Sequence, residues 1–208
     1  MFYLHSLPGW MRMIFPKNVI WEGPVNTGHE VYLTFDDGPT PEVTPFVLDQ
    51  LAKYQMKGSF FCIGSNVAKY PELYRRIIAE GHTIGNHTME HVNGWETGTE
   101  QYLQDVVQAA AHIDARFFRP PYGKIKQQQA AAIRAKFPDM QIVMWSVVAG
   151  DFDESVDGHT CAAAVEKYSK PGSLIVYHDS EKAWDRLQVA LPKTLAMLQQ
   201  KGFTSCAL

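Results

Sequence analysis

Short apolar segments alternate along this chain with segments of helical character, and this alternation is the feature that most restricts the fold. Each candidate strand ends in turn residues and is followed by apolar side chains at helical spacing. The expected strands are 30–35, 59–63, 83–85, 115–118, 141–145, 173–177 and 203–207. Strands that alternate with helices pair in parallel, so the sequence predicts an α/β fold. With 208 residues, of which 46% are hydrophobic, we expect a single domain.

Helix starts are predicted from residues whose side chains can bind the free N–H groups of a first turn. Thr40 with Pro41 after it, Asn66, and the pair Thr97 and Glu100 each fit such a start.

Unusual polar residues directly follow the expected strands. They are Asp36, Asp37, His87, His91, Arg119, Asp151 and His178. In a closed or nearly closed β/α barrel these positions meet on one face, whereas an open doubly wound sheet spreads them along an edge. The pattern therefore favours the barrel and places a site on that face.

The spacing of two histidines indicates a metal site. His87 and His91 share one face if they lie on a helical turn, and with an aspartate they make a three-ligand set for zinc. The same set holds iron in non-haem oxygenases, but those sites usually lie on antiparallel strands. The plain alternatives are solvated histidines and an ordinary Asp-Gly-Pro turn at 36–39.

Two further segments have both a structural and a chemical interpretation. The rigid run Arg119–Gly123 is either a loop with a solvated arginine or an arginine held beside a carboxylate, with a backbone N–H aimed at an oxyanion. His178 is either a core residue or a general acid at the barrel mouth. Asp151, taken alone, is interpreted as an exposed acidic residue in a loop.

Five segments, in this order, resemble the polysaccharide deacetylase family, also known as the NodB-homology domain or carbohydrate esterase family 4. They are TFDDGP (Thr34–Pro39), HTMEH (His87–His91), RPPYG (Arg119–Gly123), WSVVAGDF (Trp145–Phe152) and LIVYHD (Leu174–Asp179). The resemblance implies a distorted (β/α)7 barrel with parallel strands in one catalytic domain, residues 30–208. Residues 1–29 lie outside it, and we expect them to be an extension packed on the barrel. The apolar residues expected to form that lid are Phe2, Leu4, Trp10, Met11, Met13, Ile14 and Phe15.

The resemblance also implies a role for each matched residue. Asp36 resembles the catalytic base, and Arg119 the residue that holds it. His178 resembles the general acid, and Asp151 the partner that tunes it. The implied ligands of one divalent metal ion are Asp37, His87 and His91, with zinc expected first and cobalt, nickel or manganese as alternatives.

The substrate side of the site follows from the same motifs. Tyr122 is expected to offer its backbone N–H to the oxyanion, and Trp145 to line the sugar groove. Phe152 stands where the family usually has Trp, and Val176 where it has Leu; both positions line the pocket for the acetyl methyl group.

We therefore expect a hydrolase that acts on carbon–nitrogen bonds other than peptide bonds. It would remove N-linked acetyl groups from an N-acetylglucosamine-containing glycan and release acetate. The alternatives are an O-acetyl esterase, for instance on xylan, and a non-catalytic glycan-binding barrel. Metal-dependent hydrolysis of an acetylated glycan or oligosaccharide remains the leading interpretation.

Charge and hydropathy limit the partners and the location. The formal net charge is −3 and no segment reads as a basic arm, so we expect no nucleic-acid partner. No apolar run of about 18 residues is present, which predicts no transmembrane helix. No secretion signal is visible, so the cytoplasm is the expected location by default, while the oligomeric state stays open.

Overall fold

A computed structural model describes residues 5, 6, 13 and 15–208 of the chain. Within these residues the strands form one nine-stranded sheet in the order β1-β6-β5-β4-β3-β2-β8-β7, with β9 paired to β2. The strands are β1 (Val19–Ile20), β2 (Glu30–Asp36), β3 (Gly58–Cys62), β4 (Thr83–Asn86), β5 (Phe117–Phe118), β6 (Gln141–Val143), β7 (Val147–Val148), β8 (Leu174–His178) and β9 (Thr204–Ser205). All of these strand pairings are parallel, as the alternation predicts.

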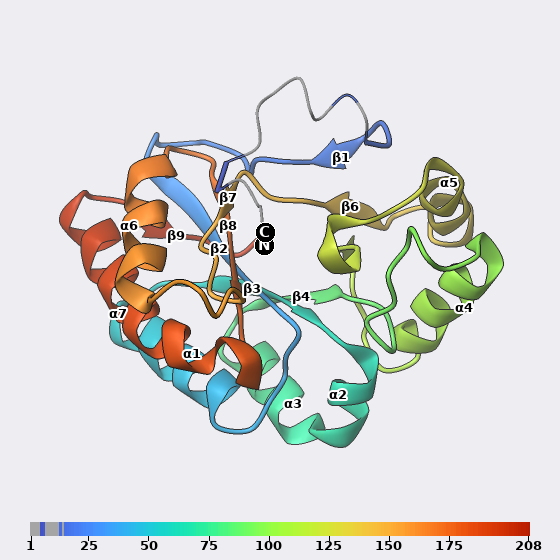
Figure 1. The fold of residues 1–208 in the computed structure, drawn as a ribbon, viewed down its shortest axis with the longest axis horizontal. Coiled ribbons are helices and arrows are strands. Elements are labelled where there is room, and N and C mark those ends of the chain that lie inside the picture. The colour runs from blue at the N-terminus through green and yellow to red at the C-terminus, as the bar shows by residue number, and fades with distance from the viewer. Residues whose placement is uncertain (1–4, 7–12, 14) are drawn as a thin grey trace.

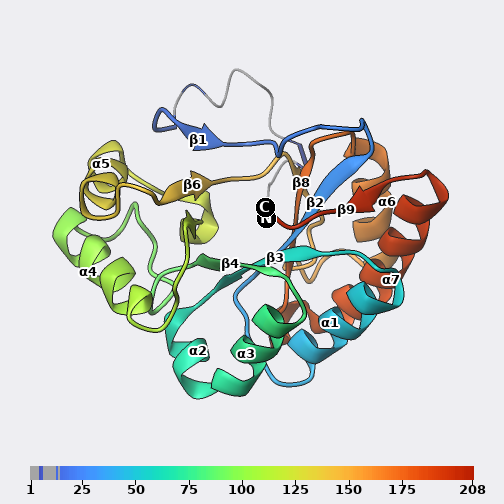
Figure 2. The same cartoon turned by 180° about the vertical axis from the view of Figure 1, so that it is seen from behind.

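The helices lie on the outside of the curled sheet, as both views show (Figures 1 and 2). They are α1 (Val43–Lys53), α2 (Gly64–Lys69), α3 (Pro71–Ala79), α4 (Thr99–Ala110), α5 (Gln127–Lys136), α6 (Gly158–Tyr168) and α7 (Trp184–Gln200), with short 3₁₀ turns at Pro121–Gly123 and Glu181–Ala183. In the described part of the chain the end strands β1 and β7 do not pair with each other, so the barrel is incomplete. The predicted α/β distorted barrel is confirmed. No described helix is long and apolar enough to cross a bilayer.

The two faces of β2 carry different side chains because residues of a strand alternate between faces. Val31, Leu33 and Phe35 belong to the main buried cluster, which also contains apolar residues of the outer helices. Thr34 and Asp36 therefore point to the inside of the curled sheet. The sheet thus separates an apolar outer layer from a partly polar interior that leads to the carboxyl ends of the strands.

Three strands are shorter than the sequence predicts. The expected strands 115–118 and 203–207 are reduced to Phe117–Phe118 and Thr204–Ser205, and the third has a visible cause. The expected strand 141–145 ends at Val143, so Trp145 lies outside it. The Arg119 guanidinium binds the carbonyl oxygens of Val143 and Met144 at 3.4 and 2.9 Å. The strand ends at this contact with Arg119, and the chain crosses to β7 beside β8.

The three predicted helix caps are wrong, because each polar side chain binds another part of the chain. Helix α1 begins at Val43, and the Thr40 hydroxyl donates to the Asp179 carbonyl at 2.8 Å. Asn66 lies inside α2 and donates to the Asp37 carbonyl at 2.7 Å. The Thr97 hydroxyl donates to a carbonyl in its own loop, and α4 begins two residues later.

The described part of residues 1–29 contacts the sheet at two places, strand β6 and strand β7. Strand β1 pairs with β6, and the Val148 N–H donates to the carbonyl of His5 at 2.8 Å. Phe15 packs edge-on against Trp21, whereas Met13 is exposed. The other expected lid residues, Phe2, Leu4, Trp10, Met11 and Ile14, lie outside the described residues. The division into an extension and a catalytic domain at residue 30 stays a prediction.

Candidate active site

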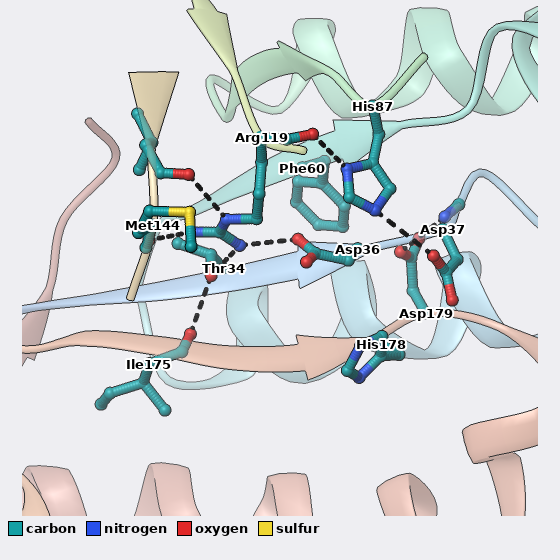
Figure 3. A network of polar contacts seen from close by, with 12 residues as sticks. Thr34, Asp36, Asp37, Phe60, His87, Arg119, Met144, Ile175, His178 and Asp179 are labelled. Carbon is teal, nitrogen blue, oxygen red and sulfur yellow. Dashed lines mark hydrogen bonds and ion pairs between the residues drawn. The ribbon is translucent and has the colours of Figure 1, made fainter. Parts of the chain in front are cut away.

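Strand register brings the polar residues to one edge of the sheet. Asp36 ends β2 and is directly opposite His178 at the end of the neighbouring strand β8. His87 follows β4, Arg119 follows β5 and Asp151 follows β7. Figure 3 shows several of these side chains grouped at the carboxyl ends of the strands. The structure therefore brings together the residues that the sequence placed after its strands.

Asp37, His87 and His91 form a cluster with the geometry of a metal-ligand set. One ligand atom from each lies within 4.8 Å of the other two. The Asp37 Oδ1 atom is 3.1 Å from Nε2 of His91 and 3.6 Å from Nε2 of His87. That oxygen is buried and makes no hydrogen bond. A carboxylate oxygen without a hydrogen bond that faces two imidazole nitrogens fits a divalent cation, and one carboxylate with two imidazoles is a donor set that zinc accepts.

The ring of His87 is held in the tautomer that ligation requires. Its Nδ1 lies 2.7 Å from the Arg119 carbonyl oxygen (Figure 3). A carbonyl only accepts, so Nδ1 carries the hydrogen and Nε2 keeps its lone pair toward Asp37. Burial lowers the pKa of His87 to about 4, which keeps the imidazole neutral near pH 7. Burial would raise the pKa of Asp37, but contact with His91 and the charge on His178 outweigh it and lower that pKa.

The segment between the two histidines is a loop and not the expected helical turn. Thr88 and His91 have positive φ values of 67° and 54°, which a helix does not contain. The carboxylate of Asp105 in α4 accepts the N–H groups of Met89 and Glu90 at 2.7 and 3.1 Å. A side chain from a distant helix thus stabilises the loop. The sequence carries no local signal for this role of Asp105.

Asp36 and Arg119 form a buried ion pair, with Nη1 of Arg119 donating to Oδ1 of Asp36 at 2.6 Å (Figure 3). Burial lowers the pKa of Arg119, but a guanidinium starts so high that it stays charged. The same nitrogen donates to the Thr34 hydroxyl at 2.7 Å, and the guanidinium stacks on the Phe61 ring at 4.0 Å. Asp36 is thereby fixed in orientation. The sequence motifs did not identify Thr34 as a site residue, although it lies two residues before Asp36 and so on the same strand face.

His178 is bound to Asp151 through two hydrogen bonds. Its Nδ1 is 2.8 Å from Oδ1 of Asp151, and its backbone N–H donates to Oδ2 at 2.8 Å. Arg186 in turn donates to the Asp151 carbonyl at 2.7 Å. Burial alone would lower the pKa of His178, but the Asp151 carboxylate outweighs it and raises that pKa to about 9. The imidazole is therefore protonated near neutral pH.

The residues expected to contact the substrate surround this centre. The Phe152 ring packs edge-on against His178 at 5.3 Å, and Val176 is buried two residues before His178 on the same strand face. The Tyr122 ring contacts His91 at 4.6 Å, and its positive φ of 58° turns the backbone there. Trp145 covers Gly123 so closely that a Cβ at that glycine would lie 2.5 Å from the indole.

Asp179 is a buried acid beside the site to which the sequence assigned no role. Its carboxyl oxygens accept the Gly38 N–H at 3.1 Å and the Thr44 hydroxyl at 2.6 Å. Its own backbone N–H donates to the Asp36 carbonyl at 3.0 Å. Asp179 thus connects the strand that carries His178 to the loop that carries Asp37. An acid directly after an apolar strand and a histidine is the sequence signal that could have identified it.

Removal of the Asp179 carboxyl should destabilise the protein. In Asp179→Ala the Gly38 N–H and the Thr44 hydroxyl lose their buried acceptor, which costs roughly 2–5 kcal/mol of unfolding free energy. Burial raises the pKa of Asp179 to about 8, so the neutral side chain of Asp179→Asn resembles the carboxyl near pH 7 and should retain most of the stability. Urea unfolding of both variants measures the difference. Equal stability of Asp179→Ala and the wild type would contradict this role.

Comparison with known proteins gives consistent matches. The profile of the family described as Polysaccharide deacetylase matches residues 24–137. A peptidoglycan-N-acetylglucosamine deacetylase of Bacillus cereus is 37% identical over 189 residues, covering 88% of this chain and 67% of the relative. A chitooligosaccharide deacetylase of a Bradyrhizobium species is 35% identical over 200 residues, covering 87% of this chain and 90% of the relative. A crystal structure of a peptidoglycan N-acetylglucosamine deacetylase with a bound benzamide superposes with a TM-score of 0.83 at 32% identity, covering 97% of this chain and 95% of that one.

Proposed function

The chain belongs to the polysaccharide deacetylase family, and from that premise we propose that it hydrolyses the acetamido group of N-acetylglucosamine residues in a glycan and releases acetate. The observation that carries the proposal is the meeting of three units at one sheet edge. These are the Asp36–Arg119 pair, the Asp37–His87–His91 cluster and the His178–Asp151 pair. The names of the two relatives, which refer to peptidoglycan and chitooligosaccharide, support N-acetylglucosamine as the sugar.

The family depends on a divalent metal ion, and Asp37, His87 and His91 are the residues that would hold it. Zinc fits this donor set best, because it accepts imidazole and carboxylate ligands and leaves positions open; cobalt, nickel and manganese bind similar sets. When bound there, such an ion polarises the acetyl carbonyl and lowers the pKa of a water molecule.

Asp36 accepts the proton of the attacking water in this proposal. Its carboxylate is buried next to the metal-ligand cluster, and the Arg119 guanidinium fixes its orientation at 2.6 Å. A base in a fixed position needs little reorganisation when the proton arrives. Arg119 does not reach the reacting atoms and acts through Asp36.

His178 supplies the proton that the leaving group needs. An amine leaves poorly as an anion, so cleavage of an amide requires proton transfer to nitrogen. The raised pKa of His178, about 9, keeps that proton available near neutral pH. Asp151 holds the ring through Nδ1 and leaves Nε2 to face the substrate. We assign the general-acid role to His178 and the tuning role to Asp151.

The remaining residues position the acetyl group. The backbone N–H of Tyr122 is the proposed donor to the oxyanion, and fixed backbone donors of this kind stabilise developing negative charge. Phe152 and Val176 flank His178 and give the methyl group an apolar pocket. Trp145, packed on Gly123, extends the apolar surface on the Arg119 side of the site.

An assay of acetate release tests the proposal. We expect N-acetylglucosamine oligomers to be deacetylated faster than acetyl-xylan, because the two relatives are named for N-acetylglucosamine glycans and a protonated histidine removes the disadvantage of the amine leaving group. A chelator should abolish the activity, and added zinc should restore it. A clear preference for acetyl-xylan would favour the O-acetyl esterase alternative. Absence of acetate release from both substrates, with metal bound, would support the non-catalytic glycan-binding barrel.

A further inference from the structure

Two exposed aromatic rings and one lysine lie beside the metal-ligand cluster. Trp95 is 57% exposed and Tyr122 is 59% exposed, which is unusual for such large side chains. The Lys124 ammonium lies 5.4 Å from the centre of the Trp95 ring and 5.7 Å from that of Tyr122. The Tyr122 ring in turn contacts His91 at 4.6 Å. Trp95, Lys124 and Tyr122 therefore form a continuous surface, the aromatic shelf, which leads away from the site.

The loop that carries Trp95 is fastened in place. The backbone N–H of Trp95 donates to Oδ1 of Asn93 at 3.0 Å. The buried Gln129 donates to the carbonyls of Gly94 and Thr97 at 2.8 and 3.1 Å. A Cβ at Gly94 would lie 2.2 Å from the Lys124 carbonyl oxygen, so the two loops are in close contact. The backbone that carries Trp95 at the surface is thus fixed by contacts with distant residues.

Resting on the proposed function, we propose that the aromatic shelf binds a second sugar ring of the same glycan chain, beyond the residue that is deacetylated. Sugar rings present C–H groups that pack on aromatic faces, and the lysine ammonium has three donors for hydroxyl groups. No described ion pair engages Lys124. Glu96 follows Trp95 in the same loop, where its carboxylate accepts from the Asn93 amide at 2.8 Å, so Lys124 is the one charged side chain of the shelf.

The occupant is a glycan and not another protein because the shelf is continuous with the proposed reaction centre. A polymer whose acetamido group reaches the metal-ligand cluster must continue across the surrounding surface, and Tyr122 joins that cluster to Trp95 through Lys124. Trp95 does not contact the reacting atoms, so it affects binding of long chains and not the chemical step.

The test compares Trp95→Ala with the wild type on N-acetylglucosamine oligomers from the shortest one hydrolysed to the pentamer. We expect the wild-type kcat/KM to rise with chain length. In Trp95→Ala the ratio of kcat/KM for the pentamer to that for the shortest oligomer should fall about three- to tenfold, mainly through KM. Trp95→Phe keeps a flat apolar ring and should recover most of the ratio. Tyr168→Ala is the matched control, since Tyr168 is also exposed with a lysine over its ring, at the end of α6 that leads into β8.

The possible outcomes separate the shelf from the proposed function. A wild-type rate independent of chain length, or an equal loss in Trp95→Ala at every length, would overturn the shelf and leave the deacetylase activity intact. Absence of acetate release from any oligomer would overturn the proposed function instead. The pentamer is then not consumed, and its Kd for wild type and Trp95→Ala, measured by calorimetry, tests the shelf alone: a weaker Kd in the variant supports it, and an unchanged Kd overturns it.

Discussion

Replacing His87 by alanine should remove most of the bound divalent metal and reduce acetate release to the level of the chelated wild type. The variant keeps only two of the three protein ligands, and no side chain of the cluster fills the position that His87 leaves. The loss should exceed that caused by any substitution outside the cluster. Metal content by elemental analysis and acetate release on the same preparation measure both effects.

His82→Ala is the matched control for this substitution. The side chains of His82 and His87 are each 2% exposed, and the two residues flank the same strand, β4, at opposite ends. Burial lowers the pKa of His82 to about 4, as it does for His87. Both variants should lose stability, which thermal unfolding measures, but only His87→Ala should lose metal. Full metal occupancy in His87→Ala would remove His87 from the ligand set.

The second large effect is expected at His178. His178→Ala should lower kcat/KM for N-acetylglucosamine oligomers by roughly 10²- to 10⁴-fold, the range for a general acid. The active form of the wild type carries the proton on His178, and the pKa of this group is raised to about 9. That form is present below this pH and is lost as pH rises through it. The wild-type profile should therefore be bell-shaped, with its basic limb near pH 9, and His178→Ala should lack that limb.

Asp151→Asn separates the tuning role from the acid role. The Asp151 carboxylate contributes most to raising the pKa of His178 against the effect of burial, and the charges of Asp37 and Asp36 add smaller contributions. Without its charge the pKa of His178 should fall, and the basic limb should move to lower pH while the imidazole remains. Measurement of kcat/KM from pH 5 to 10 for the three proteins distinguishes these cases. A basic limb unchanged in His178→Ala would assign it to another group.

The order of strands and helices could be predicted from the sequence because it depends on local patterns of apolar residues and turn residues. All seven expected strands have a counterpart in the sheet, and the polar residues that follow them lie at its carboxyl edge. The two additional strands, β1 and β7, have two residues each and were not predicted. Alternation also predicted parallel pairing, since a chain that returns through a helix enters the next strand in the same direction.

Predictions from local patterns were wrong where a polar side chain could bind either a neighbouring backbone group or a distant segment. Thr40 and Asn66 each resemble a helix cap, but both bind backbone groups of the loops that carry Asp37 and Asp179. The segment from His87 to His91 has helical spacing, yet Asp105 from α4 holds it as a loop. In each case a tertiary hydrogen bond replaced a local one, and a sequence window of a few residues contains only the local partner.

The sequence by itself determined which residue types stand at the strand ends, and through them the family and the chemistry to expect. Only the tertiary structure decided which atoms meet. The register of β2 against β8 sets Asp36 opposite His178, and the reach of Arg119 across the interior joins it to Asp36 at 2.6 Å. Exposure of Trp95 beside Tyr122 depends likewise on Gln129, far away in the chain. Pairing and packing between distant segments are set by the whole core, because the free energy of each contact depends on surfaces that other segments bury.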